Sequence, residues 1–195
     1  YTLVADLVQE EKRGTLNFIR LSPQSAQKIF IGKIFGVPML VYLAAALMVP
    51  LHLWMGSSAQ ATIPVMASWY ATLGAMWFLL SSTAVLYVLL GGVQAIVTAI
   101  AVAFPLCLPI ALINAFMSGA INNEKWLTDS DRISWFGLPI NSNAVCFYIF
   151  ATGCCLVASY GIWQALERRY LNPTATVIGK YQSYLINFCV QLWIA

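Results

Sequence analysis

The sequence predicts an all-α integral membrane protein, a helical bundle with about four complete spans and truncated spans at both ends. Residues 34–123 form ninety consecutive positions without an Asp, Glu, Lys or Arg. Of the 195 residues, 61% are hydrophobic and 9% are charged, and the mean hydropathy is +0.77. Water-soluble domains carry roughly a quarter charged residues, whereas a membrane-spanning helix needs about 20 mostly apolar residues. A bilayer is therefore the solvent that suits this composition.

Four apolar stretches are long enough to cross a bilayer. They are residues 34–54, 69–90, 93–113 and 144–166. Pro38 and Pro50 lie near the two ends of the first stretch, where a proline kinks a membrane helix if neighbouring groups bond the freed carbonyls. The second stretch opens with Trp69-Tyr70, a pair typical of the headgroup level. Gly91-Gly92 predicts a tight turn before the third.

The two ends of the chain are apolar but short. Residues 1–8 are expected to be the end of a span, and residues 184–195 the start of a further one that is too short to cross. We therefore expect truncation at both ends. The polar segments are too short to fold separately, so residues 1–195 are expected to form a single transmembrane domain.

The basic residues predict the orientation, because Lys and Arg concentrate on the cytoplasmic side. Eight of the ten fall in residues 9–33 and 167–182, so both segments are expected to be cytoplasmic. These eight are Lys12, Arg13, Arg20, Lys28, Lys33, Arg168, Arg169 and Lys180. Residues 114–143, with only Lys125 and Arg132, are expected to form an external loop with pieces apolar enough to re-enter the membrane.

No pattern in the chain predicts catalysis, a metal or a cofactor. His52 is the one acidic or basic residue in the predicted spans, and an interfacial side chain is its simplest interpretation. The five cysteines show no CxxC spacing. Ser81-Ser82-Thr83 and Thr98 fit helix packing. An acid–base enzyme and a proton-coupled carrier are both disfavoured, and nothing indicates nucleic-acid binding.

The polar segment from Asp6 to Lys33 is the most informative part of the chain. Gly14-Thr15 and Ser22-Pro23 each predict the start of a short helix at the membrane surface. In the second pair, Ser22 can cap the helix and Pro23 is tolerated in its first turn. Two interpretations fit its mixture of charged and apolar residues equally well. The segment is either an amphipathic connector between spans or a docking element for a cytoplasmic partner.

Three short runs in this segment resemble a known family. They are Glu10-Glu11-Lys12-Arg13-Gly14-Thr15-Leu16, Leu21-Ser22-Pro23-Gln24-Ser25 and Ile31-Gly32-Lys33. Their order is similar to the loop between the second and third spans of ABC transporter permeases of the ABC-2 type. From there to about Leu166 the resemblance is one of span layout alone. Glu167 to Thr174 is similar to uncharacterised bacterial members with a longer C-terminal part.

The resemblance implies that residues near Gly14 to Ser25 form a coupling helix in a cleft of a separate ATP-binding subunit. The implied contact residues are Glu11, Arg13, Gly14, Thr15, Leu16, Phe18, Ile19, Arg20, Ser22, Pro23 and Ser25. This chain has no Walker motif, so ATP hydrolysis would occur in that partner. The resemblance also implies a second permease copy, as a homo- or heterodimer, in a bacterial inner or internal membrane.

The sequence leaves two functions open. One is a permease subunit of an ATP-driven exporter; spans without charge suit an amphipathic or lipid-like substrate better than small ions. The other is a non-transporting structural or assembly subunit of a larger membrane complex, because a fold does not decide a function. A bound ATPase with Walker motifs would favour the first, and stoichiometric membership of another complex would favour the second.

Overall fold

The structure is a computed structural model that describes residues 1–15, 23–58, 61–91, 134–135, 138–139, 144–174 and 176–194. Within these ranges the fold is helical apart from one pair of two-residue strands. Three helices are long and apolar enough to cross a bilayer, which is compatible with a multi-pass membrane protein. They are α4 (Met39–Ser58), α5 (Ile63–Leu89) and α7 (Ala144–Leu171). The predicted span at residues 93–113 lies outside the described residues.

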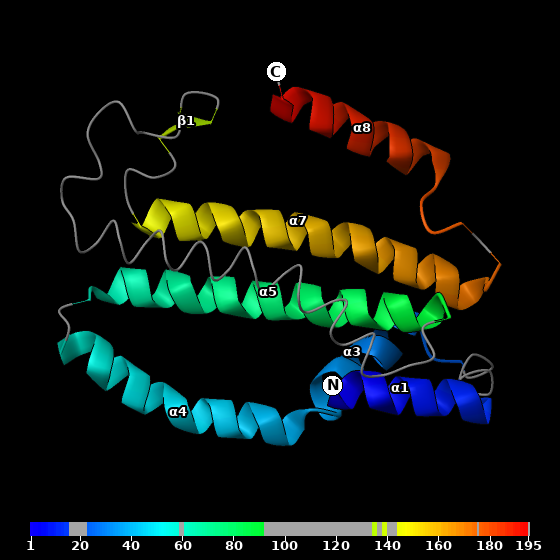
Figure 1. Cartoon of the computed structure of the whole chain (residues 1–195), viewed down its shortest axis with the longest axis horizontal. Helices are drawn as coiled ribbons and strands as arrows, with labels where there is room; N and C mark the ends of the chain where they lie inside the picture. The colour runs from blue at the N-terminus through cyan, green and yellow to red at the C-terminus, as the bar shows by residue number, and fades with distance from the viewer. Residues whose placement is uncertain are drawn as a thin grey trace.

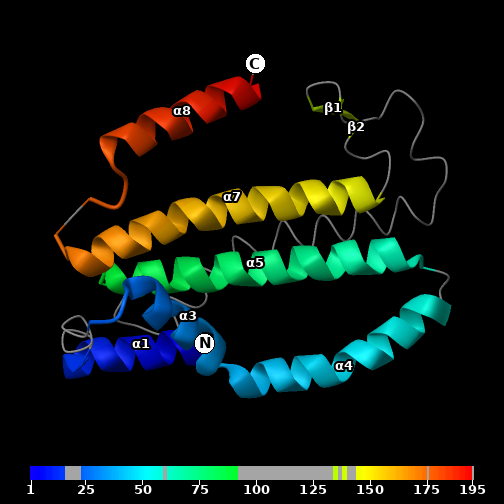
Figure 2. The same ribbon diagram turned by 180° about the vertical axis from the view of Figure 1, so that it is seen from behind.

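The long helices lie roughly along one axis, with α5 and α7 side by side (Figures 1 and 2). α4 runs away from the N-terminal helices, α5 returns beside it, and α7 runs in the same direction as α5. The end of α5 and the start of α7 therefore lie at opposite ends of the bundle.

Small residues allow α5 and α7 to pack closely. Ala75 and Ser82 of α5 are buried, as are Ser159 and Ala165 of α7. Small side chains let two helix backbones approach closely. In lipid this close packing drives helix association, because the hydrophobic effect does not favour contact between two apolar helices there. Ser82 is fully buried, which agrees with its interpretation as a helix-packing residue; Thr98 lies outside the described residues.

By contrast, α4 has no buried residue. Its links to α5 lie towards its two ends. Near the start of α4, the rings of Tyr42 and Trp77 meet edge to face with centroids 4.8 Å apart. Near the other end, His52 stacks on Trp69 at 4.9 Å. The apolar side chains between these two links are exposed, which suits contact with lipid.

Pro38 explains why the first span starts later than predicted. Residues 34–36 belong to a separate helix, α3 (Ala26–Gly36), and α4 begins at Met39. Pro38 has no N–H to donate to the carbonyl of Ile34, four residues earlier. The hydroxyl of Tyr42 donates to that carbonyl instead, at 2.7 Å. A side chain thus satisfies the backbone group that the proline leaves free, as a membrane helix requires.

Two other helices extend beyond the spans predicted for them. α5 begins six residues before Trp69, because Thr62 is its N-cap and Pro64 fits its first turn. α7 continues five residues beyond Leu166, to Leu171, and carries Arg168 and Arg169 in its last turn. Basic residues are favourable at that end of a helix, so the helix extends past its apolar part.

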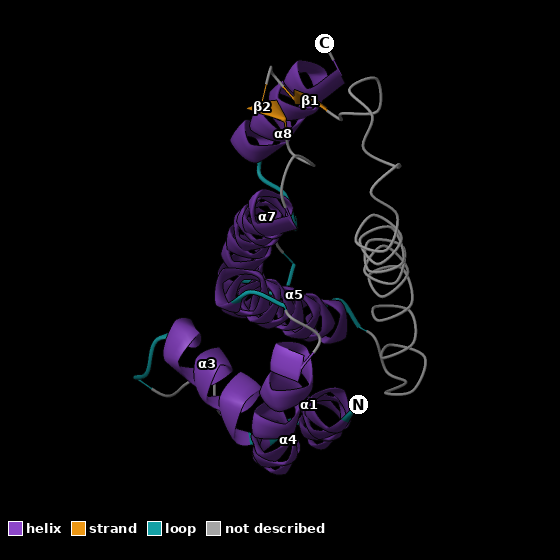
Figure 3. Cartoon of the chain, turned by 90° about the vertical axis from the view of Figure 1, so that its left-hand side faces the viewer, coloured by secondary structure: helices purple, strands orange, loops and turns teal. Residues whose placement is uncertain are grey.

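At the N-terminus, α1 (Thr2–Arg13) ends at Gly14, whose φ of 73° is left-handed, a conformation that suits glycine. α3 begins at Ala26 with Ser25 as its N-cap, so the predicted start at Ser22-Pro23 is wrong by three residues. Figure 3 views the long helices nearly end-on and shows α3 from the side. α3 therefore runs across the bundle, as a helix at a membrane surface would.

The largest apolar cluster lies where α1 and α3 meet the ends of α5 and α7. Its buried members are Leu3, Val4, Leu7, Val8, Phe30, Ile34, Ala84, Val85, Val88, Leu89, Leu166 and Tyr170. Arg169 also donates from Nε to the carbonyl of Leu89 at 3.5 Å. The two basic segments therefore come together at one end of the bundle, which we call the basic end.

The remaining elements are short. β1 (Ser134–Trp135) pairs antiparallel with β2 (Leu138–Pro139), within the segment predicted as the external loop; the rest of that segment lies outside the described residues. The final helix, α8 (Lys180–Ile194), begins four residues before the predicted last piece. α8 folds back over the α7 side of the bundle (Figure 1).

Candidate functional site

We call α1 and α3 together the platform. The predicted contact residues that the structure describes lie at the outer rim of this platform. Glu11, Arg13, Gly14 and Thr15 are exposed at the end of α1, and Pro23 and Ser25 are exposed before α3. The remaining predicted contacts lie outside the described residues. These are Leu16, Phe18, Ile19, Arg20 and Ser22.

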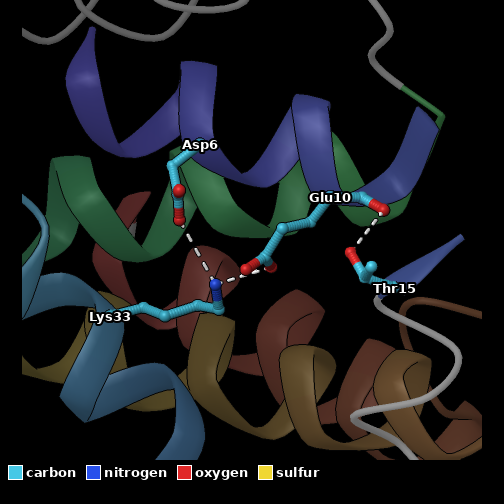
Figure 4. Close-up of polar contacts among 4 residues, drawn as sticks. All are labelled: Asp6, Glu10, Thr15 and Lys33. Carbon is cyan, nitrogen blue, oxygen red and sulfur yellow. Dashed lines mark hydrogen bonds and ion pairs between the residues drawn. The ribbon is translucent and has the colours of Figure 1, made fainter. Parts of the chain in front are cut away.

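An ion-paired cluster joins the two helices of the platform (Figure 4). The ammonium group of Lys33 on α3 lies 2.6 Å from a carboxylate oxygen of Glu10 and 3.3 Å from one of Asp6. Asp6 and Glu10 are one turn apart on α1, so both face the same side. Only 15% of the Lys33 side chain is exposed. Partial burial weakens solvent screening, so this pairing contributes more than a surface salt bridge.

The exit from α1 is also fixed by hydrogen bonds. The backbone N–H of Gly14 donates to the carbonyl of Glu11 at 3.1 Å, and the hydroxyl of Thr15 donates to the carbonyl of Glu10 at 3.1 Å (Figure 4). The last carbonyls of a helix have no partner within it. These two bonds satisfy two of them, the carbonyls of Glu10 and Glu11, and set the direction in which the chain leaves α1.

The sequence contained part of the signal for this cluster. Asp6 and Glu10 share the i, i+4 spacing that puts two side chains on one helix face. Two acids on one face predict a basic partner, but five basic residues lie within the first 35 positions. Only the packing of α3 against α1 selects Lys33.

A second feature is a cavity of about 420 Å³ between α5 and α7, towards the end opposite the platform. No charged residue lines it. Its lining comprises Trp69, Thr72, Leu73, Met76, Phe147, Tyr148, Phe150, Ala151, Cys154 and Cys155. The hydroxyl of Thr72 lies within 3.0 Å of the carbonyls of Ser68 and Tyr148 and of the hydroxyl of Thr152. Its hydrogen-bonding capacity is therefore used inside the protein, and the cavity wall is apolar.

His52 lies at the same end as this cavity. Its Nδ1 is 2.9 Å from the hydroxyl of Tyr70, and its ring stacks on Trp69. Such an arrangement fits the predicted interfacial role, because the aromatic rings belong to the headgroup level. Among the described residues, no three His, Cys, Asp or Glu side chains are placed to hold a metal ion.

Comparison with known proteins found no matching family, no similar characterised protein and no solved structure of similar fold. The geometry and the chemistry of the side chains must therefore support any assignment of function.

Proposed function

We propose that this chain is the transmembrane permease subunit of an ATP-driven exporter of the ABC-2 type. In this proposal the segment from Gly14 to Ser25 docks on a separate cytoplasmic ATP-binding subunit, and the basic end faces the cytoplasm. The main support is the way the platform is built. Its two helices are joined by Lys33, and both are packed on the ends of α5 and α7.

A docking element must be anchored to transmit force, and the platform has such an anchor. Leu7 of α1 and Phe30 of α3 are each 1% exposed within the cluster at the basic end. Protein interiors are close-packed and have low compressibility. Displacement of the platform by a partner would therefore move α5 and α7 instead of being absorbed locally.

The exposed rim suits a partner surface. Glu11 and Arg13 are exposed and carry opposite charges, and rim charges mainly set orientation and the rate of association. Leu16, Phe18 and Ile19 supply the apolar anchors that carry affinity in protein interfaces. The partner would provide the pocket for these anchors and the nucleotide site that this chain lacks.

The cavity between α5 and α7 supports an apolar class of substrate. An apolar wall without charge, whose Thr72 hydroxyl is already bonded, favours a hydrocarbon chain over an ion or a sugar. We therefore propose an amphipathic or lipid-like substrate. A second permease copy would complete the path, and the unburied face of α4 leaves ample apolar surface for lipid or for that copy.

Affinity purification of the full chain from detergent-solubilised membranes of its own cells tests the proposal. The wild type should carry a soluble subunit with Walker motifs. Arg13→Glu should reduce the amount of that subunit, because a predicted contact reverses its charge. Lys28→Glu is the matched control: Lys28 is also exposed, lies on α3 and is not a predicted contact, so its variant should retain the partner.

Two outcomes would contradict the proposal. In the first, the chain is purified as a stoichiometric member of another membrane complex without any ATPase, which favours the structural or assembly role. In the second, Arg13→Glu and Lys28→Glu lose the ATPase to the same extent. That result would mean that the overall charge of the platform, and not the segment that follows α1, binds the ATPase.

A further inference from the structure

Hydrogen bonds join the start of α8 to α7. The side-chain amide of Gln182 donates to the side-chain oxygen of Gln164 on α7. The side-chain oxygen of Gln182 also accepts a hydrogen bond from the backbone N–H of Gly179 at 3.1 Å. We call this junction, residues 164–169 of α7 with residues 179–182, the α7–α8 corner.

Arg168 lies at the centre of this corner, one helical turn after Gln164. Its guanidinium packs directly on the backbone of Gly179: a Cβ built there would lie 2.9 Å from Nη1 and 3.3 Å from Nη2. Nη1 is buried and has no hydrogen-bond partner among the described residues. A buried donor on a charged group is costly when it is left unpaired. The corner thus leaves a charged donor unpaired, and Arg168 must turn away from Gly179 before Nη1 can reach an acceptor outside the protein.

The groups around Arg168 favour a hydrogen-bond acceptor that carries negative charge. Neither Arg168 nor Lys180 forms an ion pair within the described part of the chain, and the adjacent Glu167 forms none there either. Lys180 is exposed at the start of α8. The first N–H groups of α8 add partial positive charge beside the two cations. No ion pair within the described residues offsets these two cations.

We propose that the α7–α8 corner binds the phosphate group of an anionic phospholipid. Arg168 follows the apolar part of α7, so it lies at headgroup level if α7 spans the membrane. A guanidinium pairs with two phosphate oxygens at once, which a lysine cannot do. Ile178 and Tyr181 are 51% and 80% exposed beside it and offer contact to acyl chains. This apolar surface favours a lipid over free phosphate. The proposal does not depend on the partner ATPase.

The test uses the full chain in neutral detergent micelles and follows its thermal unfolding midpoint. Phosphatidylglycerol should raise the midpoint in a saturable manner, whereas phosphatidylcholine and inorganic phosphate should not. Arg168→Gln should weaken the half-saturation for phosphatidylglycerol by about tenfold to a hundredfold, the loss expected for a charge-assisted hydrogen bond. Lys28→Gln removes the same charge from an exposed position on α3 and should leave the response unchanged.

A second variant covers the case in which Arg168→Gln does not fold. Arg168→Lys keeps the charge but not the paired geometry, so its half-saturation should lie between those of the wild type and Arg168→Gln. The proposal is overturned if the Arg168 variants respond to phosphatidylglycerol as the wild type does. It is also overturned if phosphatidylcholine raises the midpoint equally, or if inorganic phosphate alone reproduces the effect, which would identify a free-phosphate site.

Discussion

Phe30 of α3 and Tyr170 of α7 meet edge to face, with ring centroids 5.1 Å apart and ring planes inclined by 78°. Phe30 lies before the first long helix, and Tyr170 lies in the last turn of α7, 140 residues later in the chain. This contact fixes both basic segments at the same end of the bundle. It also couples the platform to α7.

Loss of this contact should destabilise the basic end. Phe30 is 1% exposed, so Phe30→Ala should lower the free energy of unfolding by about 3–5 kcal/mol. The matched control is Phe35→Ala on the same helix, because Phe35 is 53% exposed and should cost far less. Denaturant titration in mixed micelles measures both. Equal losses would mean that α3 does not pack as described.

The ion pairs that Lys33 makes with Glu10 and Asp6 should contribute to the stability of the protein, although they lie outside the long helices. Lys33→Met leaves Glu10 and Asp6 without their shared cation, and we expect a loss of about 1–2 kcal/mol, since both carboxylates retain some access to water. Lys28→Met, at an exposed position on α3, should stay within about 0.5 kcal/mol of the wild type. Faster amide hydrogen exchange in α1 of the Lys33 variant alone would support the bridge. Unchanged exchange would argue against it.

The bond from Tyr42 to the Ile34 carbonyl should depend on Pro38. Tyr42→Phe should cost about 1 kcal/mol, because the carbonyl that the proline leaves free loses its donor. In a Pro38→Ala background, the new backbone N–H can donate to that carbonyl, so Tyr42→Phe should then cost almost nothing. A double-mutant cycle on unfolding free energies measures the difference. A coupling energy near zero would show that the hydroxyl does not serve this role.

The two basic segments should be reached from the same side of the membrane. In a background without native cysteines, Glu11→Cys and Lys180→Cys should react with a membrane-impermeant maleimide only after the cytoplasmic face is opened. Ser58→Cys, at the far end of α4, should react in intact cells. Labelling of Glu11→Cys and Lys180→Cys from opposite sides would contradict the arrangement of α1 and α7.

The presence of apolar helices could be predicted from the sequence because lipid imposes one strict requirement. Every backbone group must be bonded internally, so long uncharged runs such as those containing Leu47 or Val85 have few alternatives to a helix. Their ends were less predictable. α5 starts earlier than expected because Pro64 fits its first turn, and α4 starts later because Pro38 separates it from α3.

The candidate site was only partly visible in the sequence. The exposed rim at Glu11 and Arg13 follows from the charged run, but the contact between Lys33 and Glu10 depends on how α3 crosses the bundle. Arg168 was expected to mark orientation alone. Its burial against Gly179 is a tertiary contact between α7 and the start of α8, and no local pattern predicts it.

The most direct test of the proposed function is the ATPase activity of the reconstituted complex carrying Leu16→Asp. A carboxylate in place of an apolar anchor should abolish the transport-coupled ATPase activity, because a buried, unpaired charge is costly at an interface. Membrane insertion should be unaffected, since Leu16 lies outside the predicted spans. Coupled activity equal to that of the wild type, with normal insertion, would contradict the assignment of Gly14 to Ser25 as the docking segment.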